Sequence, residues 1–242
     1  MKKILLIAGH GDGDCGAVGC GYKEADLTRE MANLIKPYLE GYAEVDIAST
    51  SKNWYKYICK EKNTFNFKPY DYVLENHFNA CVNDEKGNGK TTGTEIYVTT
   101  SEKGTSVEEG IVKNISKLGL TNRGVKKKNW SLIHHIKSQG VSCALLEVCF
   151  IDDADDMYIY SSKREDIAKA IVKGIVDGFG LQAKETGLKD ISGHYAEDYI
   201  KDLYDIGIVK GDGNGKFKPD ETLKRGDAAI MIRNAIKYIT GK

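Results

Sequence analysis

The stretch Ile4-Leu5-Leu6-Ile7-Ala8-Gly9-His10 decides the fold, because it joins a continuous apolar run to a glycine and a histidine. A short run without polar alternation is typical of a strand that is buried on both faces of a sheet. Residues 24 to about 39 place their apolar side chains on one helical face, and Pro37 is expected to end or kink this helix near its last turn. The chain therefore opens with a buried strand and an amphipathic helix.

The same alternation continues to about residue 180. Further strands are expected at residues 45–47, 70–76, 93–99 and 143–148, and further helices at residues 107–118 and 167–179. Alternating strands and helices predict an α/β domain, with a mainly parallel twisted sheet flanked by helices over residues 1–180. Residues 181–187 are polar and aperiodic, which indicates a linker. Residues 188–242 are expected to form a small, mostly helical module.

Net charge and the lengths of the apolar runs argue against two classes of protein. The 242 residues allow one domain or two, and 35 Lys+Arg balance 35 Asp+Glu, so the formal net charge is zero. A neutral chain argues against a broad electrostatic grip on nucleic acid or anionic lipid. No stretch approaches the roughly 20 apolar residues of a membrane span, so no membrane insertion is expected.

The apolar run at the start of the sequence ends at Ala8, which makes it shorter than the roughly 7–15 residues of a signal-peptide core. We therefore expect synthesis in the cytoplasm without a signal peptide. If the substrate lies outside the membrane, another protein must then provide the exit route.

Four polar residues lie where the predicted elements meet one edge of the sheet. His10 and His77 each directly follow a predicted strand. Glu147 lies near the end of a third strand, and Glu24 begins the first helix. Ligands of open parallel sheets bind outside the carboxyl ends of the strands, so these side chains are expected to gather in one crevice. Two imidazoles and one carboxylate form the ligand set of a catalytic zinc ion that keeps one position open for water.

Glu147 is the strongest single signal, because it interrupts the apolar segment Cys143-Ala144-Leu145-Leu146-Glu147-Val148-Cys149-Phe150. A buried carboxylate is costly without a partner, and one beside a metal ion can serve as general base and acid. The alternative is a structural ion pair. Taken singly, each histidine fits an ordinary hydrogen-bonding role, and Glu24 fits a solvated helix start that suits the helix dipole.

The residues around these candidates resemble the zinc-dependent N-acetylmuramoyl-L-alanine amidases of the third type, and phage endolysins in particular. Gly9-His10-Gly11 together with Lys23-Glu24 resembles the opening motif of that family. His77-Phe78-Asn79-Ala80 is similar to the segment that provides the third zinc ligand. One departure is Ile7-Ala8-Gly9, where the family more often has Asp-Pro-Gly, which changes the turn but no ligand.

Two further segments extend the resemblance over about residues 1–180. Gly93-Thr94-Glu95-Ile96-Tyr97 resembles the strand that follows the third ligand. Ala144-Leu145-Leu146-Glu147-Val148-Cys149-Phe150-Ile151 is similar to the segment with the catalytic glutamate. All four motifs stand in the family's order and spacing.

The resemblance implies hydrolysis of the amide between N-acetylmuramic acid and L-alanine in peptidoglycan. It assigns His10, Glu24 and His77 as zinc ligands. It gives Glu147 the task of taking a proton from water and passing it to the leaving amine. The likeness to endolysins implies release to the wall through a holin pore or on lysis. A non-catalytic wall-binding protein, and a zinc carboxypeptidase or deacetylase acting on the wall, remain as alternatives.

Basic residues outside this constellation have weaker signals. Arg123 follows the second predicted helix in the first domain and is a candidate for lining a substrate groove. Lys126-Lys127-Lys128 is interpreted as a solvated loop, with contact to an anionic wall polymer as the alternative.

The residues from 188 onward resemble one S-layer homology repeat, including Gly207-Ile208-Val209-Lys210-Gly211 and Phe217-Lys218-Pro219-Asp220. Asp190 matches the opening aspartate of that family, and Arg225 stands where its polymer-contacting arginine is expected, which implies binding of a secondary cell-wall polymer. Such repeats usually come in threes, so a single copy leaves apolar faces without partners. We therefore expect homo-oligomers through this module, which would raise avidity. The alternative is a small stabilising appendage without a ligand.

Overall fold

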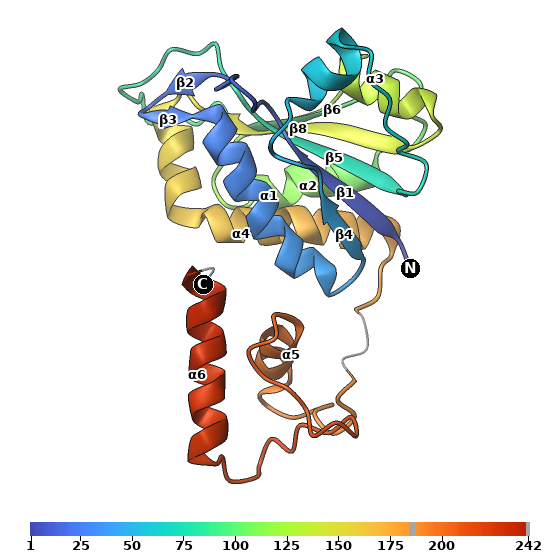
Figure 1. The fold of residues 1–242 in the computed structure, drawn as a ribbon. Coiled ribbons are helices and arrows are strands. Elements are labelled where there is room, and N and C mark those ends of the chain that lie inside the picture. The colour runs from blue at the N-terminus through green and yellow to red at the C-terminus, as the bar shows by residue number, and fades with distance from the viewer. Residues whose placement is uncertain (184–186, 241–242) are drawn as a thin grey trace. The chain divides into compact units, whose positions relative to one another are not determined.

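The computed structural model describes residues 1–183 and 187–240, and Figure 1 shows its helices and strands. The chain forms two compact units, Met1–Gln182 and Ala183–Lys242. Residues 184–186 of the predicted linker and residues 241–242 of the predicted module lie outside the described residues. Within the described part of the chain, no helix combines the length and the apolar character that a membrane span requires.

A six-stranded sheet forms the centre of the first unit. Its strand order is β4 (Glu44–Ile47), β1 (Lys3–Ala8), β5 (Tyr72–Asn79), β8 (Ser142–Phe150), β6 (Thr94–Val98) and β7 (Asn122–Lys127). From β4 to β8 the neighbouring strands are parallel, whereas β6 is antiparallel to β8 and β7 is parallel to β6. The predicted mainly parallel sheet of an α/β fold is therefore confirmed. A separate two-stranded hairpin consists of β2 (Val18–Gly19) and β3 (Tyr22–Lys23).

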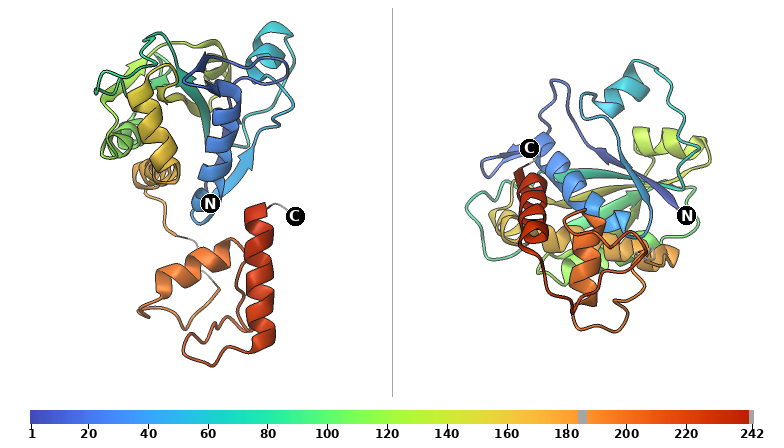
Figure 2. Two further views of the ribbon diagram at one scale, coloured as in Figure 1. Left: turned by 90° about the vertical axis from the view of Figure 1, so that its left-hand side faces the viewer. Right: turned by 60° about the horizontal axis from the view of Figure 1, so that its bottom comes forward.

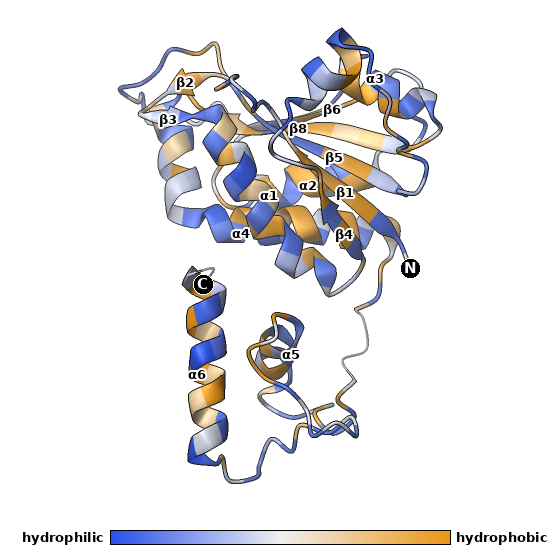
Figure 3. Ribbon diagram, in the orientation of Figure 1, coloured by the Kyte–Doolittle hydropathy of each residue, from blue (hydrophilic) through white to orange (hydrophobic). Residues whose placement is uncertain are grey.

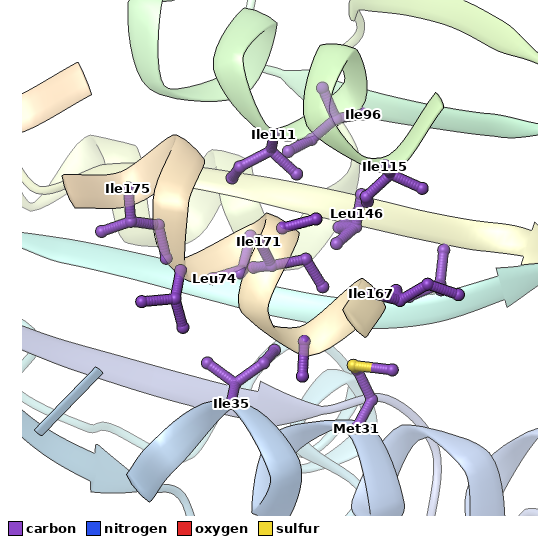
Figure 4. Packing of buried hydrophobic residues seen from close by; sticks show 14 of the residues in the cluster. Met31, Ile35, Leu74, Ile96, Ile111, Ile115, Leu146, Ile167, Ile171 and Ile175 are labelled. Atoms are coloured by element: carbon purple, nitrogen blue, oxygen red, sulfur yellow. The ribbon is translucent and has the colours of Figure 1, made fainter. Parts of the chain in front are cut away.

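One face of the sheet is covered by α1 (Glu24–Glu40), α2 (Ser106–Ser116) and α4 (Ala154–Phe179), as Figure 1 shows. Branched apolar side chains from the strands and from these helices interlock in the larger core of the unit (Figure 4). Gly174 lets α4 approach α2 closely, because a Cβ atom there would lie 2.5 Å from the backbone nitrogen of Ile111.

The opposite face is covered by shorter elements. α3 (Ser131–Ser138) and the π-helix η1 (Lys56–Lys60) pack there, together with Trp54 and Phe67, against Leu5, Val73 and Cys143. Neither helix was predicted, because elements of 8 and 5 residues give too little periodicity to recognise. The carboxyl ends of β1, β5 and β8 border a cleft on this face.

Two strands differ from the prediction in ways that affect this cleft. β5 continues to Asn79, so His77 lies inside the strand and not directly after it. Lys126 and Lys127 belong to β7, so the interpretation of this basic run as a loop was wrong for these two residues. They lie on an edge strand that pairs with β6, and charged residues are common on edge strands.

Two helices end or begin where local chemistry dictates. Pro37 lies in the last turn of α1, which ends at Glu40, as predicted. α4 begins at Ala154, well before the predicted start at residue 167. The carboxylate of Asp153 caps this end, because it accepts hydrogen bonds from the backbone N–H groups of Asp155 and Asp156.

The second unit is small and mostly helical, as predicted. A loop joins α5 (Glu197–Asp205) to α6 (Arg225–Thr240), and its course is visible in the two views of Figure 2. Leu188, Ile191 and Ile200 form the buried cluster of this unit. No residue of α6 is buried, although Figure 3 shows apolar residues along its length.

Candidate metal centre and active-site cleft

A cleft of about 410 Å³ opens at the carboxyl ends of β1, β5 and β8. The structure brings together here the four residues singled out in the sequence, namely His10, Glu24, His77 and Glu147. Aromatic side chains from the segments that precede η1 and α3 also line the cleft: Trp54, Tyr55 and Trp130. A polar floor beside aromatic walls is typical of a pocket that binds an organic substrate.

Glu24 connects the two imidazoles. It is the first residue of α1, and its carboxylate is buried. One oxygen, Oε2, lies 3.0 Å from His10 Nε2, and the other, Oε1, lies 2.9 Å from His77 Nδ1. The backbone N–H groups of Ala17 and Phe78 donate hydrogen bonds to the same two oxygens, which fixes the orientation of the carboxylate.

Two glycines leave the space that this arrangement needs. A Cβ atom on Gly9 would lie 2.4 Å from Cε1 of His77. A Cβ atom on Gly16 would lie 2.7 Å from Oε2 of Glu24 and 2.8 Å from Cδ2 of His10. Any larger residue at either position would displace the imidazoles or the carboxylate, so the backbone itself is shaped around these three side chains.

The three side chains fit a divalent metal ion. One candidate ligand atom from each of His10, Glu24 and His77 lies within 4.8 Å of the other two. Two nitrogens and one carboxylate oxygen suit zinc, which in catalytic sites takes three protein ligands and keeps one position open. All three residues line the cleft.

Two further carboxylates, which the sequence analysis missed, contact the outer nitrogens of the imidazoles. Asp14 Oδ2 lies 2.9 Å from His10 Nδ1, and Glu75 Oε1 lies 3.0 Å from His77 Nε2. Each ring therefore has one nitrogen facing Glu24 and the other facing an outer carboxylate. Metal-binding histidines commonly donate their second N–H in this way, which orients the ring and fixes its tautomer.

The carboxylates set the charge of the metal-free group. Burial disfavours a charged His77, but hydrogen bonds to Glu24 and Glu75 outweigh it and raise the pKa of the imidazole well above its usual value. The same balance, with Glu24 and Asp14, raises the pKa of His10. Both imidazoles together hold the pKa of Glu24 below its usual range despite its burial. Because metal ligation requires neutral imidazoles, metal binding would displace these protons.

Glu147 lies beside this group on the next strand. In the sheet it is paired with His77 of β5 on one side and with Glu95 of β6 on the other. Its Oε2 atom is buried and has no hydrogen-bond partner among the described residues. Burial raises the pKa of the carboxyl to about 7. A buried carboxyl oxygen without a partner, in a cleft, is available to a water molecule or a substrate.

Arg123, the candidate for the substrate groove, lies on β7 and does not line the cleft. Its Nε donates a hydrogen bond to the buried carboxylate of Glu95, and Lys126 Nζ donates to the same oxygen. Burial of Glu95 opposes its charged form, but these two cations lower its pKa. Neither Glu95 nor Lys126 was singled out in the sequence as a site residue.

Asp190 and Arg225, the candidates for polymer binding, belong to the second unit. The carboxylate of Asp190 accepts hydrogen bonds from the backbone N–H groups of Phe217 and Lys218, which lower its pKa. It thereby ties the start of the unit to the Phe-x-Pro-Asp segment. Arg225 is exposed at the first position of α6.

Several known proteins are similar to this chain in sequence or in fold. The endolysin of Bacillus phage SPP1 is 29% identical, and the match covers 100% of this chain and 98% of that protein. The N-acetylmuramoyl-L-alanine amidase LytC of Bacillus subtilis (strain 168) is 30% identical over 64% of this chain, which spans 30% of that longer protein. The solved catalytic domain of the CD27L endolysin targeting Clostridia Difficile has the same fold, with a TM-score of 0.58 at 22% identity over 73% of this chain and 98% of that one.

Two families match separate parts of the chain. Residues 187–229 match the S-layer homology domain. Residues 4–177 match the family described as N-acetylmuramoyl-L-alanine amidase, and they include the whole candidate metal centre. With most of its 242 residues matched in this way, the chain belongs to the N-acetylmuramoyl-L-alanine amidase family.

Proposed function

We propose that the protein is a zinc-dependent peptidoglycan hydrolase, which cleaves the amide between the lactyl group of N-acetylmuramic acid and L-alanine. The observation that carries this proposal is the group of His10, Glu24 and His77 beside the unpartnered Glu147, in one cleft. Family membership supports the reaction, and the match to a phage endolysin along the whole chain supports action on the bacterial wall at lysis.

Three side chains would hold the metal ion, namely His10, Glu24 and His77. When bound there, zinc supplies a Lewis acid that polarises the amide carbonyl and lowers the pKa of a water molecule to about 7. Asp14 and Glu75 keep the imidazoles in the orientation and tautomer that ligation needs, because each accepts the outer N–H of one ring.

The proton transfers fall to Glu147. Its buried Oε2 takes a proton from the attacking water, and the same carboxyl group then delivers that proton to the nitrogen of the departing alanine. The amide C–N bond breaks, the lactyl group leaves as a carboxylic acid, and the peptide leaves with a free amine. Burial suits both steps, since it raises the pKa of Glu147 to about 7, where the group can accept and release a proton near neutral pH.

The released products test the reaction. We expect the zinc-loaded protein to generate new N-terminal alanine from purified peptidoglycan, with no acetate and no free D-alanine. Acetate would identify a deacetylase, and free D-alanine a carboxypeptidase. A strong chelator is expected to stop the reaction, and added zinc to restore it. Wall clearing that continues unchanged in the chelator would contradict a metal-dependent mechanism.

For the second unit we propose attachment to a secondary cell-wall polymer. The S-layer homology match over residues 187–229 supports this role, and the exposed Arg225 is the proposed contact with the polymer. Asp190 has a structural role in this proposal, because its carboxylate accepts hydrogen bonds from the backbone N–H groups of Phe217 and Lys218.

We further propose that the protein forms homo-oligomers through this unit. Ile230, Ile232 and Ile236 of α6 are 59%, 61% and 55% exposed, so the helix presents apolar surface to solvent. Sedimentation velocity is expected to show a species larger than the monomer at micromolar concentration. Replacing Ile232 and Ile236 with serine should return it to the monomer. A wild-type protein that sediments as a monomer at these concentrations would rule out self-association.

A further inference from the structure

The side chains of the cleft continue in a row across the sheet, beyond the metal centre. His77 of β5 is paired with Glu147 of β8, and Glu147 is paired with Glu95 of β6. Directly paired residues of neighbouring strands project from the same face of a sheet. The row therefore runs from a proposed zinc ligand, past the proposed proton carrier, to a buried carboxylate one strand further on.

A β-bulge extends this row to the edge of the sheet. Thr94 of β6 is paired with Asn122 of β7, but Ile96 is paired with Val125, so two residues of β7 oppose the single residue Glu95. These two residues are Arg123 and Gly124, and Gly124 has the positive φ of 78° that such an irregularity requires. Bulges of this kind re-aim side chains, and this one directs both Arg123 and Lys126 to Glu95.

Two cations converge on the carboxylate of Glu95. Both Arg123 Nε and Lys126 Nζ donate to the same oxygen of Glu95, while Asn79 and Tyr97 donate to its other oxygen. The side chains of Arg123 and Lys126 are 36% and 37% exposed, whereas that of Glu95 is 2% exposed.

Arg123 is held in place by its neighbours, but its guanidinium retains N–H groups that can still donate hydrogen bonds. Its Nε is fixed on Glu95, and its guanidinium carbon lies 4.9 Å from the centre of the Phe150 ring. Within residues 1–183 and 187–240, no acceptor receives a hydrogen bond from either of its terminal nitrogens. A fixed guanidinium with free N–H groups matches the two oxygens of a carboxylate.

Arg123 lies on the side of Glu147 that faces away from the proposed metal ligand His77. The carbonyl that is attacked must lie at the metal ligands, and the departing nitrogen must lie at Glu147, which protonates it. On the leaving-group side of Glu147, the sheet continues away from β5, towards β6 and β7. Strands lie about 4.8 Å apart, and an extended peptide advances roughly 3.3–3.6 Å per residue, so the residue after alanine reaches the Glu95–Arg123 side of the row.

We propose that Arg123, supported by Lys126, binds the free carboxylate of the stem residue that follows L-alanine and thereby selects acidic peptide stems. Glu95 holds both side chains in place, because each donates a hydrogen bond to it at the bulge. This inference rests on the proposed amidase function, and it names the chemical class that the Glu95–Arg123 group, next to the cleft, recognises beside the cleaved bond. A stem whose carboxylate is amidated offers a neutral group in the same place and leaves the N–H groups of Arg123 without a charged acceptor.

The test uses two soluble muramoyl peptides that differ only in a free carboxylate or a carboxamide on the second stem residue. Cleavage by the zinc-loaded full chain gives kcat and KM for each peptide. Binding is measured by calorimetry on the full chain with Glu147→Gln, which does not require turnover. In both measurements we expect the carboxylate peptide to be favoured about 10-fold or more, the value of a charge-assisted hydrogen-bonded pair, with the difference mainly in KM.

Arg123→Met is expected to bring this ratio close to one, by weakening the carboxylate peptide about 10-fold and leaving the carboxamide peptide nearly unchanged. Lys127→Met is the matched control, because Lys127 is on the same strand but its Nζ donates to the backbone carbonyl of Glu102. If Arg123→Met fails to fold, Arg123→Lys replaces it: one ammonium engaged with Glu95 cannot also form the fork, so the ratio should still fall.

Measuring binding and cleavage separately distinguishes failure of the proposed carboxylate site from failure of the proposed amidase function. A binding preference of the Glu147→Gln protein that is lost when Arg123→Met is added supports the carboxylate site, whatever the cleavage assay shows. Equal binding of the two peptides by the Glu147→Gln protein, or an unchanged ratio when a folded Arg123 substitution is added to it, overturns it. Failure of the zinc-loaded wild type to cleave either peptide, with binding intact, instead overturns the proposed amidase function.

Discussion

Replacing Glu147 with glutamine is expected to lower kcat on peptidoglycan by about 100- to 10,000-fold while zinc remains bound, the range that general acid–base groups contribute. The amide has nearly the shape of the carboxyl group but cannot take the proton of water or return it to the leaving amine. Glu147 is not one of the three grouped ligand residues, so the metal content of the purified variant should equal that of the wild type.

The control for this variant is Glu108→Gln. Glu108 is a buried glutamate of α2 that accepts a hydrogen bond from Tyr72 and does not line the cleft. Its replacement tests the effect of a buried glutamine without touching the site, and kcat should be unchanged. Wall hydrolysis at the wild-type rate by a zinc-loaded Glu147→Gln protein would reject the proposed role.

The fold was accessible from the sequence because its signals are local. The run from Ile4 to Ala8 is apolar without interruption, and β1 occupies this stretch with every residue after Lys3 buried. Alternating patterns of this kind gave the α/β class, and the structure confirms it. α3 and η1 escaped prediction since they are short, and their place is set by packing against Phe67 and Val73 rather than by their own periodicity.

The site was accessible only where its residues lie in recognisable segments. His10, His77 and Glu147 follow or interrupt apolar runs, which singled them out. Nothing local marks Asp14 or Glu75, because their partners are known only once His10 and His77 have been placed by the fold. The group of Glu95, Arg123 and Lys126 depends on a bulge between two strands that are distant in the sequence, and β7 itself was not predicted.

Removal of one proposed metal ligand should have a different signature from removal of the proton carrier. His10→Ala is expected to lose both zinc and activity, with affinity falling by more than the roughly 10- to 100-fold that loss of an outer partner costs. Asp14→Asn is the comparison: because Asp14 contacts the outer nitrogen of His10, this variant should show only the smaller loss of zinc affinity. Competition with a coloured chelator gives both affinities on one scale.

The order of these affinities tests how the centre is built. His135→Ala is the control: this histidine lies on α3, pairs with Gln139 and does not line the cleft, so its loss should leave zinc affinity unchanged. If His10 binds the metal directly and Asp14 only supports it, zinc affinity should be highest in the wild type, lower in Asp14→Asn and lowest in His10→Ala. A His10→Ala protein that retains full zinc would place the ion on other residues. Equal losses in both variants would mean that Asp14 acts as a ligand, in which case the ligand set extends beyond Glu24 and the two imidazoles.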